Sequence, residues 1–462
     1  MYDLSSLLQP DKGQSAISLV LVDKKGFEGW LSGQQPRVRG AVAAQGFRGD
    51  GFQIAYLPGE RDRWSALLGV ADVDALGVWC LAKAAEALPE GAYRVEARGP
   101  GPAALGWLLG QYRFGRYKEE KPAKAPRVLL TDAPARLDET IALAEATFLV
   151  RDLVNTPAQD MGPADLEAVA AALAVEHGAE LKTISGVELE EGYPMVAAVG
   201  RAASAERAPR LIELLWGDRR HPRIAIVGKG VCFDSGGLDI KPADGMRLMK
   251  KDMGGAAHAL ALARLAMGRK LPVRLHLLVP AVENAISAAA FRPGDVLRSR
   301  KGLTVEVGNT DAEGRLILGD ALSRAGEEKP ELILDFATLT GAARVALGPD
   351  LPALFASDDS LADSLLAGGT EVSDPLWRMP LWTNYEEMLS SDVADLGNVG
   401  EGGMAGAVTA ALFLRKFVPD RMAWAHLDTF AWRSAARPGR PKGGDALGLR
   451  AAWEALKARY AA

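Results

Sequence analysis

Short apolar runs alternate with longer stretches of mixed polarity along most of the chain. Near the N-terminus, the run at 17–22 predicts a buried strand and the stretch 74–88 predicts a helix. Beyond residue 163, apolar runs and helical stretches follow one another regularly, which is typical of a sheet covered by helices. Strands are predicted at 195–199, 211–215, 224–227, 275–279, 303–307, 332–336 and 423–427, and helices at 253–266 and 317–325.

One longer helix is predicted at 136–155, because apolar residues recur there on one helical face. Pro157 restricts the residue before it, so the helix should end near that point. The charged, proline-containing segment 118–126 is typical of a surface loop.

These boundaries predict an α/β protein with two domains. Residues 1–134 form a smaller mixed α/β N-terminal domain, residues 135–157 a linking helix, and residues 158–462 a larger α/β domain whose central sheet has helices on both faces.

Composition excludes some classes of protein. The 54 basic and 59 acidic residues give a net charge of −5, which gives no support for a protein that coats nucleic acid. No run approaches the roughly 20 apolar residues of a membrane-spanning helix, and no secretory signal precedes the first strand. We therefore expect a cytoplasmic protein that does not bind membranes.

Three glycine-rich segments in the second half carry unusual charge. They are 227–237, 249–257 and 308–316, and they follow predicted strands or open predicted helices. Each charge has an ordinary explanation, since Asp caps helices, Glu complements a helix dipole and most lysines are solvated. Three such segments in one domain instead predict a ligand site beyond the carboxyl ends of the strands.

Other hydrolase and nucleotide-binding motifs are missing from these segments. Lys229 lies in Gly-Lys-Gly and does not match the phosphate-loop spacing, and Ser235 lies in Asp-Ser-Gly-Gly rather than in a nucleophile elbow. No histidine pair has the spacing of a zinc-binding helix, and His258 and His276 fall where core histidines are expected.

The remaining interpretation is an oxygen-rich metal site. Four clustered carboxylates, those of Asp234, Asp252, Asp311 and Glu313, would repel one another without cations. Two divalent ions would balance their charge, and carboxylates can bridge ions about 3.5–4 Å apart. The ligand types suit Zn or Mn and do not choose between them.

The same segments resemble those of the leucyl aminopeptidase, or cytosol aminopeptidase, family. The segment from Asn309 to Leu316 is highly specific for that family, and further likeness occurs at 155–158, 337–342, 391–396 and 424–428. The resemblance covers essentially all of the chain from Arg151 onward. It implies a metallo-exopeptidase that releases N-terminal, apolar residues from peptides by two-metal activation of a bridging water.

The resemblance also implies a role for each motif residue. Lys229 and Asp252 would bind one ion, Asp311 the other, and Asp234 and Glu313 both. The other implied roles are oxyanion stabilisation by Lys241, binding of a bicarbonate ion by Arg315, and substrate binding by Met249, Asn309, Thr338, Leu339 and Gly341.

One departure from the family pattern follows Asp428. The family often has a small-residue stretch there, whereas this chain has Thr429-Phe430-Ala431-Trp432, so Phe430 could change the preference for the first side chain. The family also implies a homohexamer. Two other functions remain open at this point: a DNA-binding regulator on the same scaffold, and a dipeptidase narrowed to Cys-Gly.

Overall fold

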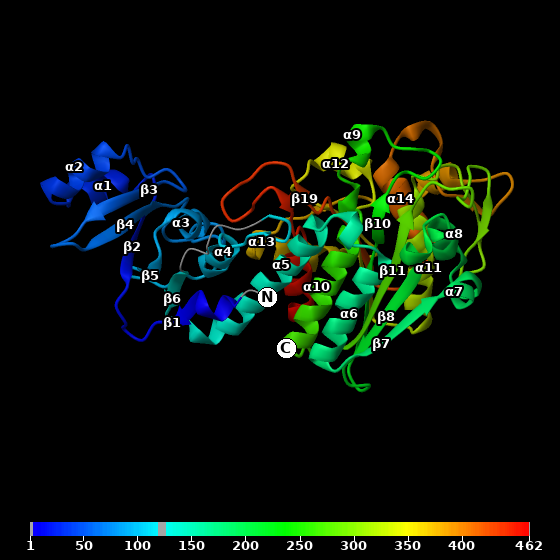
Figure 1. The fold of residues 1–462 in the computed structure, drawn as a ribbon, viewed down its shortest axis with the longest axis horizontal. Coiled ribbons are helices and arrows are strands. Elements are labelled where there is room, and N and C mark those ends of the chain that lie inside the picture. Colours follow the sequence, from blue (N-terminus) through cyan, green and yellow to red (C-terminus); the bar gives the residue numbers. More distant parts are fainter. Residues whose placement is uncertain (1–2, 119–125, 462) are drawn as a thin grey trace. The chain divides into compact units, whose positions relative to one another are not determined.

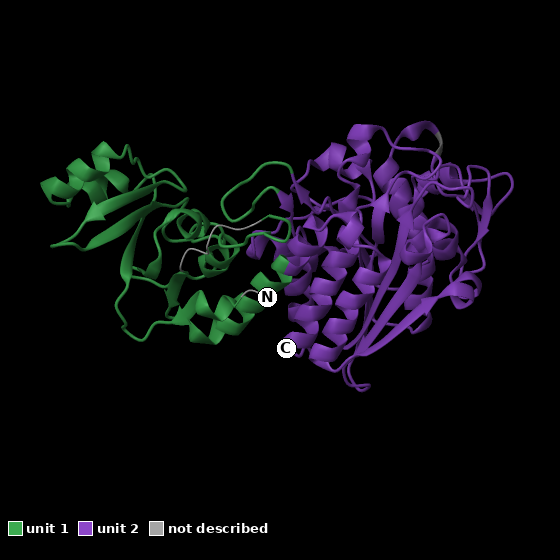
Figure 2. Ribbon diagram, in the orientation of Figure 1, with its two compact units in different colours: residues 1–148, 434–442 green, residues 149–433, 443–462 purple. Residues whose placement is uncertain are grey.

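The computed structural model describes residues 3–118 and 126–461, and it divides into two compact units (Figure 2). Unit 1 comprises Met1–Phe148 and Ser434–Lys442, and unit 2 comprises Leu149–Arg433 and Gly443–Ala462. The division falls within α5 (Leu137–Asn155), the long helix predicted from the sequence. The loop predicted at 118–126 lies largely outside the described residues.

Unit 1 contains a six-stranded sheet with the order β1-β6-β5-β2-β4-β3. All neighbouring strands are parallel except β3 and β4, which are antiparallel. The strands are β1 (Leu8–Pro10), β2 (Ile17–Val22), β3 (Ile54–Pro58), β4 (Trp64–Gly69), β5 (Gly91–Val95) and β6 (Arg127–Thr131), and the α-helices are α1 (Phe27–Ser32), α2 (Pro36–Ala44), α3 (Ala82–Ala87) and α4 (Ala103–Leu109).

Unit 2 contains a nine-stranded sheet in which β18, β14, β9 and β11 form a parallel centre. The edges are mixed: β8 and β15 run antiparallel to their central neighbours, and β10 pairs with one end of β11. The strands are β7 (Glu180–Ser185), β8 (Arg210–Trp216), β9 (Arg223–Gly228), β10 (Gly230–Asp234), β11 (Arg274–Asn284), β14 (Leu332–Ala337), β15 (Ala353–Ala356), β16 (Trp377–Arg378) and β18 (Trp424–Asp428).

Helices cover both faces of this sheet, which confirms the predicted fold class (Figure 1). One group packs around α10 and the other around α11. The helices are α6 (Pro163–His177), α7 (Gly186–Gly192), α8 (Pro194–Gly200), α9 (Ala243–Met246), α10 (Gly254–Gly268), α11 (Glu313–Glu327), α12 (Gly341–Leu347), α13 (Asp359–Glu371), α14 (Gly406–Arg415) and α15 (Leu449–Tyr460).

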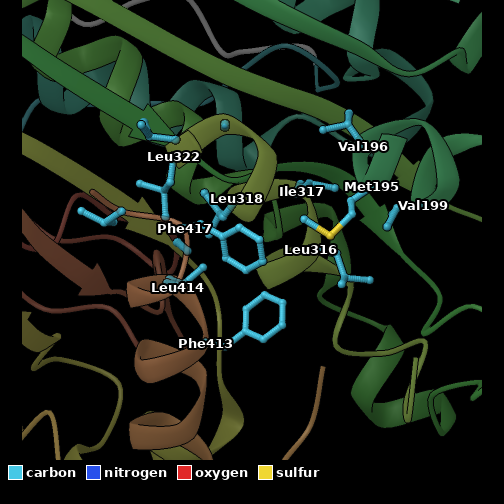
Figure 3. Close-up of a cluster of buried hydrophobic side chains, with 14 of the residues drawn as sticks. Met195, Val196, Val199, Leu316, Ile317, Leu318, Leu322, Phe413, Leu414 and Phe417 are labelled. Carbon is cyan, nitrogen blue, oxygen red and sulfur yellow. The ribbon is translucent and has the colours of Figure 1, made fainter. Parts of the chain in front are cut away.

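The α11 side of the sheet holds a large apolar core. Figure 3 shows Met195 of α8, Leu318 of α11 and Phe413 of α14 among the side chains that meet there. The Phe413 and Phe417 rings lie 5.1 Å apart. This packing fixes the start of α11, where two of the predicted ligands lie.

The prediction of a strand at 195–199 was wrong, because these residues form α8. A short apolar run that is buried all round cannot be assigned to helix or strand from its periodicity. Pro194 at the first helical position favours a helix. The buried Asp320 carboxylate accepts hydrogen bonds from the Met195 and Val196 amides at 2.8 and 3.2 Å and so caps that helix.

Two other predicted elements also differ. At 303–307 the chain forms only β13 (Thr304–Glu306), which joins β12 (Val296–Arg298) and β17 (Leu396–Gly397) in a separate small sheet. At 74–88 only α3 is helical, since Gly77 interrupts the stretch and glycine disfavours a helix interior.

Candidate active site

The candidate site lies where the parallel strands of unit 2 end. Lys229 follows β9, Asp234 ends β10, Asn284 ends β11, Thr338 follows β14 and Asp428 ends β18. Parallel neighbours in a sheet share one carboxyl edge, so the topology brings these distant segments together. The sequence predicted this edge as the ligand site.

Two helices begin at the same edge. Asp252 lies two residues before the start of α10, and Glu313 is the first residue of α11. Glycine allows the close approach: a Cβ on Gly255 would lie 2.2 Å from the Phe336 carbonyl oxygen, and one on Gly314 would lie 2.4 Å from Cε of Lys229. The glycines flanking the charged residues are therefore required by packing.

Lys229 is buried between two carboxylates. Its Nζ lies 2.8 Å from Oδ2 of Asp252 and 3.0 Å from Oε1 of Glu313, and it donates a hydrogen bond to the Thr338 carbonyl oxygen at 3.1 Å. Burial alone would lower the pKa of Lys229, but the charges of Asp252, Glu313 and Asp234 outweigh it and raise the pKa.

Lys241 makes a second pair of contacts. Its Nζ lies 3.0 Å from Oδ2 of Asp234 and 2.5 Å from Oδ1 of Asp311. The other oxygen of Asp234 accepts hydrogen bonds from the Asn284 amide group at 2.8 Å and from the Gly236 backbone at 2.9 Å. The two predicted lysines therefore lie on different carboxylate pairs of one cluster.

The carboxylates are crowded and poorly supplied with hydrogen-bond donors. Oxygens of Asp234, Asp252 and Glu313 all lie within 4.8 Å of one another, and all three residues are buried. Among the residues that the structure describes, Glu313 has Lys229 as its one ion-pair partner, and neither of its oxygens accepts a hydrogen bond. Burial, reinforced by Asp234, raises the pKa of Glu313 to about 8, and the same two causes raise that of Asp311 to about 6.

This donor set fits divalent cations. Buried acidic groups are stable when they are paired or bind metals, and the lysines compensate the carboxylates only in part. Asp234, Asp252 and Glu313 meet the geometric requirement for one ion, and Asp311 adds a fourth carboxylate on the Lys241 side. Oxygen ligands with one amine suit ions such as Mn or Zn.

Arg315, in the first turn of α11, is buried and lines the same pocket. Its Nη1 donates a hydrogen bond to the Asn398 carbonyl oxygen at 2.7 Å, whereas its Nε has no hydrogen-bond partner among the described residues. Burial lowers the pKa of Arg315 to about 10. A buried guanidinium with a spare donor is suited to binding a small anion.

A pocket of about 490 Å³ opens over this cluster. Its lining includes all the residues predicted to bind substrate and every predicted ligand and catalytic residue except Glu313, which lies beneath Lys229. The substrate-binding candidates are Met249, Asn309, Thr338, Leu339 and Gly341. Phe430 also lines the pocket, as its place after Asp428 suggested.

Several supporting residues were missed by the sequence analysis. The Asn284 side chain orients Asp234, and the Asn398 side chain hydrogen-bonds the backbone of Asn309. Asp428 accepts hydrogen bonds from the Leu339 and Thr340 backbone amides. Asn284 and Asp428 could have been found from their position at strand ends. Asn398 carries no such signal, since it follows the short strand β17.

The two histidines expected in the core are there. Nδ1 of His258 hydrogen-bonds the Gly254 carbonyl oxygen at 2.7 Å, and Nε2 accepts from the Leu447 amide at 3.0 Å. Nε2 of His276 lies 3.0 Å from Oε1 of Glu213.

Comparison with known proteins identifies the family. Residues 148–452 match the catalytic domain of the cytosol aminopeptidase family, and residues 17–130 match the N-terminal domain of M17 aminopeptidases. The chain belongs to the cytosol aminopeptidase family. This confirms the resemblance inferred from the motifs and extends it to unit 1, for which the motifs gave no comparable signal.

Individual relatives agree with this assignment. A probable cytosol aminopeptidase of Syntrophotalea carbinolica is 42% identical over 362 residues, which cover 75% of this chain and 72% of the relative. The crystal structure of a cytosol aminopeptidase from Coxiella burnetii is 46% identical, with a TM-score of 0.92 over 98% of this chain and 99% of that one. The bottromycin maturation enzyme BotP in complex with Mn is 32% identical, with a TM-score of 0.86 over 96% and 100% of the two chains.

Membership in the cytosol aminopeptidase family makes this chain a metallo-aminopeptidase, a hydrolase of peptide bonds. Within the described residues, no helix has the length and apolar character needed to cross a membrane.

Proposed function

We propose that this aminopeptidase holds two divalent ions at the carboxylate cluster and releases N-terminal, apolar residues from peptides. The observation that supports it best is the group of buried carboxylates around Lys229 and Lys241, which lack enough protein donors. When bound, the ions would polarise the scissile carbonyl and activate a bridging water for attack.

The ligand roles in this proposal are those that the family resemblance implies. Lys229 and Asp252 would hold one ion and Asp311 the other, with Asp234 and Glu313 shared between them. Support comes from the proximity of Asp234, Asp252 and Glu313 and from the position of Asp311 on the other side of Asp234. Mn or Zn suits these ligands, and the related BotP structure is described as a complex with Mn.

Lys241 and Arg315 would act on charge that develops during the reaction. Lys241 is a charged ammonium at the pocket, because Asp234 and Asp311 outweigh its burial and raise its pKa. It can donate a charge-assisted hydrogen bond to the oxyanion of the tetrahedral intermediate. Arg315 would hold a bicarbonate ion through its spare Nε donor, and that ion would relay a proton.

Selectivity for N-terminal residues would come from the free α-amine. In this proposal the amine enters the carboxylate-rich end of the pocket and completes the ligands of one ion. The first side chain would lie against Met249, Leu339 and Gly341, with Asn309 and Thr338 beside the substrate backbone. In an acylated amine the nitrogen lone pair is delocalised into the carbonyl group, so the nitrogen could not bind an ion in this way.

Blocked and free substrates test this directly. With added Mn or Zn, leucine p-nitroanilide should be hydrolysed and its N-acetyl derivative should not, in an assay of released p-nitroaniline. Equal cleavage of the two would show that the chain is not an aminopeptidase of this kind.

We also propose that the protein is a cytoplasmic homohexamer. Unit 2 exposes large apolar side chains such as Trp377, Trp382 and Val345, which an assembly would cover. Light scattering should give a mass near six times 49.0 kDa. A stable and fully active monomer would contradict this assignment.

A further inference from the structure

One wall of the pocket is both aromatic and cationic. Phe430 lies in the stretch where this chain departs from the family pattern, and two cations lie over its ring. Nζ of Lys251 is 5.2 Å from the ring centroid, and Cζ of Arg344 is 5.0 Å from it. All three residues line the pocket together with Met249 and Gly341, which the proposed function places at the first substrate side chain.

Neither basic side chain forms a hydrogen-bonded ion pair with a carboxylate in the described part of the chain. Lys251 is buried, which lowers the pKa of its ammonium group, and its nearest acidic contact is Oδ1 of Asp252 at 3.7 Å, within ion-pairing but beyond hydrogen-bonding distance. That oxygen already accepts a hydrogen bond from Thr338 at 2.7 Å. Arg344 is exposed on α12, and its cation–π contact with Phe430 is the one side-chain interaction recorded for it among the described residues.

The acidic groups of this part of the pocket compensate the two basic side chains only in part. The charges of Asp252 and Asp428 favour the ammonium form of Lys251 but do not outweigh its burial, which lowers its pKa. Asp428 already accepts hydrogen bonds from the Leu339 backbone and from the backbone and hydroxyl of Thr340, and Asp244 lies on α9 at the exposed rim. The exposed Arg344 thus keeps its positive charge at the Phe430 wall of the pocket.

We propose that the pocket accepts an acidic N-terminal residue, glutamate or aspartate, as a second substrate class beside apolar residues, with the side-chain carboxylate held by Lys251 and Arg344. This inference rests on the proposed aminopeptidase function. The methylene groups of such a side chain contact Met249 and the Phe430 ring, and its carboxylate meets the cations.

Glutamate and glutamine side chains have nearly the same shape, so a comparison of the two substrates isolates the effect of the side-chain charge. The kcat/KM for glutamyl p-nitroanilide should exceed that for glutaminyl p-nitroanilide at least about tenfold, as a hydrogen bond to a charged partner implies. In Arg344→Gln this ratio should fall towards one. Arg269→Gln, which removes an exposed arginine at the far end of α10, is the matched control and should keep the wild-type ratio.

A second variant tests the buried cation. Lys251→Met keeps the length and apolar stem of the side chain and should also lower the glutamate-to-glutamine ratio, with bound metal measured by elemental analysis in the same samples. Free glutamate should raise the Tm of the loaded enzyme more than free glutamine does, and Arg344→Gln should remove that difference. This binding measurement does not depend on turnover.

Distinct outcomes separate the two proposals. Hydrolysis of leucyl but equal hydrolysis of glutamyl and glutaminyl substrates overturns the acidic class and leaves the aminopeptidase function standing. Failure to hydrolyse any aminoacyl substrate with Mn or Zn overturns the proposed function itself. The enzyme could instead prefer Leu-Gly over its C-terminal amide, lose that preference in Arg344→Gln, and show no preference for glutamate. That result would assign Lys251 and Arg344 to binding of the peptide C-terminus and would also overturn the acidic class.

Discussion

Both units have acidic residues at the carboxyl ends of parallel strands, but those of unit 2 are buried and those of unit 1 are not. In unit 1, Asp23, Glu96 and Asp132 directly follow the parallel strands β2, β5 and β6. None of them is buried. Asp23 accepts hydrogen bonds from the Gly26 and Val73 backbone amides at 2.7 and 3.3 Å, and these bonds lower the pKa of its carboxyl.

In unit 2 the acidic residues at the strand edge are buried and share too few donors. Burial raises the pKa of Glu313 to about 8, the opposite direction to Asp23. A parallel strand edge therefore supplies a position for a site, and the burial and crowding of carboxylates decide whether the position binds cations. Among the described residues, clusters that could hold a metal are found only in unit 2.

The largest effect should follow loss of a carboxylate from the cluster. Asp311→Asn removes one ligand charge, so we expect it to lower metal occupancy and to reduce kcat by at least about 10³-fold, since attack and carbonyl polarisation both depend on the ions. Chelation of the wild type should abolish activity, and Mn or Zn should restore it. Elemental analysis and leucine p-nitroanilide turnover give both readouts, and active enzyme that contains no metal would refute the assignment.

The two lysines should separate metal binding from transition-state stabilisation. Lys229→Ala should lower metal occupancy at one of the two sites, and excess metal should partly rescue activity. In the wild type the lysine must lose its proton to become a ligand. Lys241→Ala should keep both ions while kcat falls about 10²–10³-fold, as for loss of one oxyanion donor. Metal titration combined with kcat distinguishes these outcomes.

A reversed pattern would exchange the two roles. If Lys241→Ala loses an ion and Lys229→Ala keeps both, the lysines have been assigned wrongly. Normal turnover in both variants would mean that this strand edge resembles the one in unit 1 and serves only the fold.

The candidate site could be inferred from local sequence because its chemistry is concentrated in three short segments. Glycine next to charge at 227–237 and 308–316 indicated both the strand edge and the close backbone approach, and the structure brings those side chains into one pocket. The main strands could be predicted for a similar reason, since fully buried parallel strands such as β9 and β14 are continuous apolar runs.

The features that the sequence did not predict depend on contacts between residues that are far apart in the chain. Residues 195–199 form a helix because Asp320, far along the chain, caps it. In the basic segment that begins at Arg433, Arg433 is buried between Asp445 and Asp350, and Arg440 lies over Trp79. No local pattern indicates such partners, and the same holds for the approach of Lys251 and Arg344 to Phe430.

A smaller effect should appear in the pH dependence of unit 2. Burial lowers the pKa of His258 below its usual 6.5, so the folded state binds fewer protons than the unfolded chain. The stability conferred by the neutral ring is fully present above pH 6.5 and is lost as the pH falls, by up to about 1.4 kcal/mol per pH unit. The free energy of unfolding, measured by urea unfolding with chelator present, should fall with pH in the wild type and fall less steeply in His258→Gln.

The matched control is His221→Gln, which changes an exposed histidine and should keep the wild-type pH dependence. Protonation would turn Nε2 from the acceptor of the Leu447 amide hydrogen bond into a donor, so it should be unfavourable in the folded state. An identical slope in wild type and His258→Gln would show that this ring does not link pH to folding.

The smallest effect should come from Asp23, the unit 1 counterpart of the clustered carboxylates of unit 2. Asp23→Asn keeps one side-chain oxygen to accept a backbone hydrogen bond but removes the charge, so the Tm should fall by no more than a few degrees. Neither metal content nor kcat/KM should change, because an exposed carboxylate that already has backbone donors has no need of a cation. Calorimetry, elemental analysis and the leucine p-nitroanilide assay on one preparation check all three. Loss of metal from Asp23→Asn would break the comparison, since the strand edge of unit 1 would then contribute to cation binding despite its exposure.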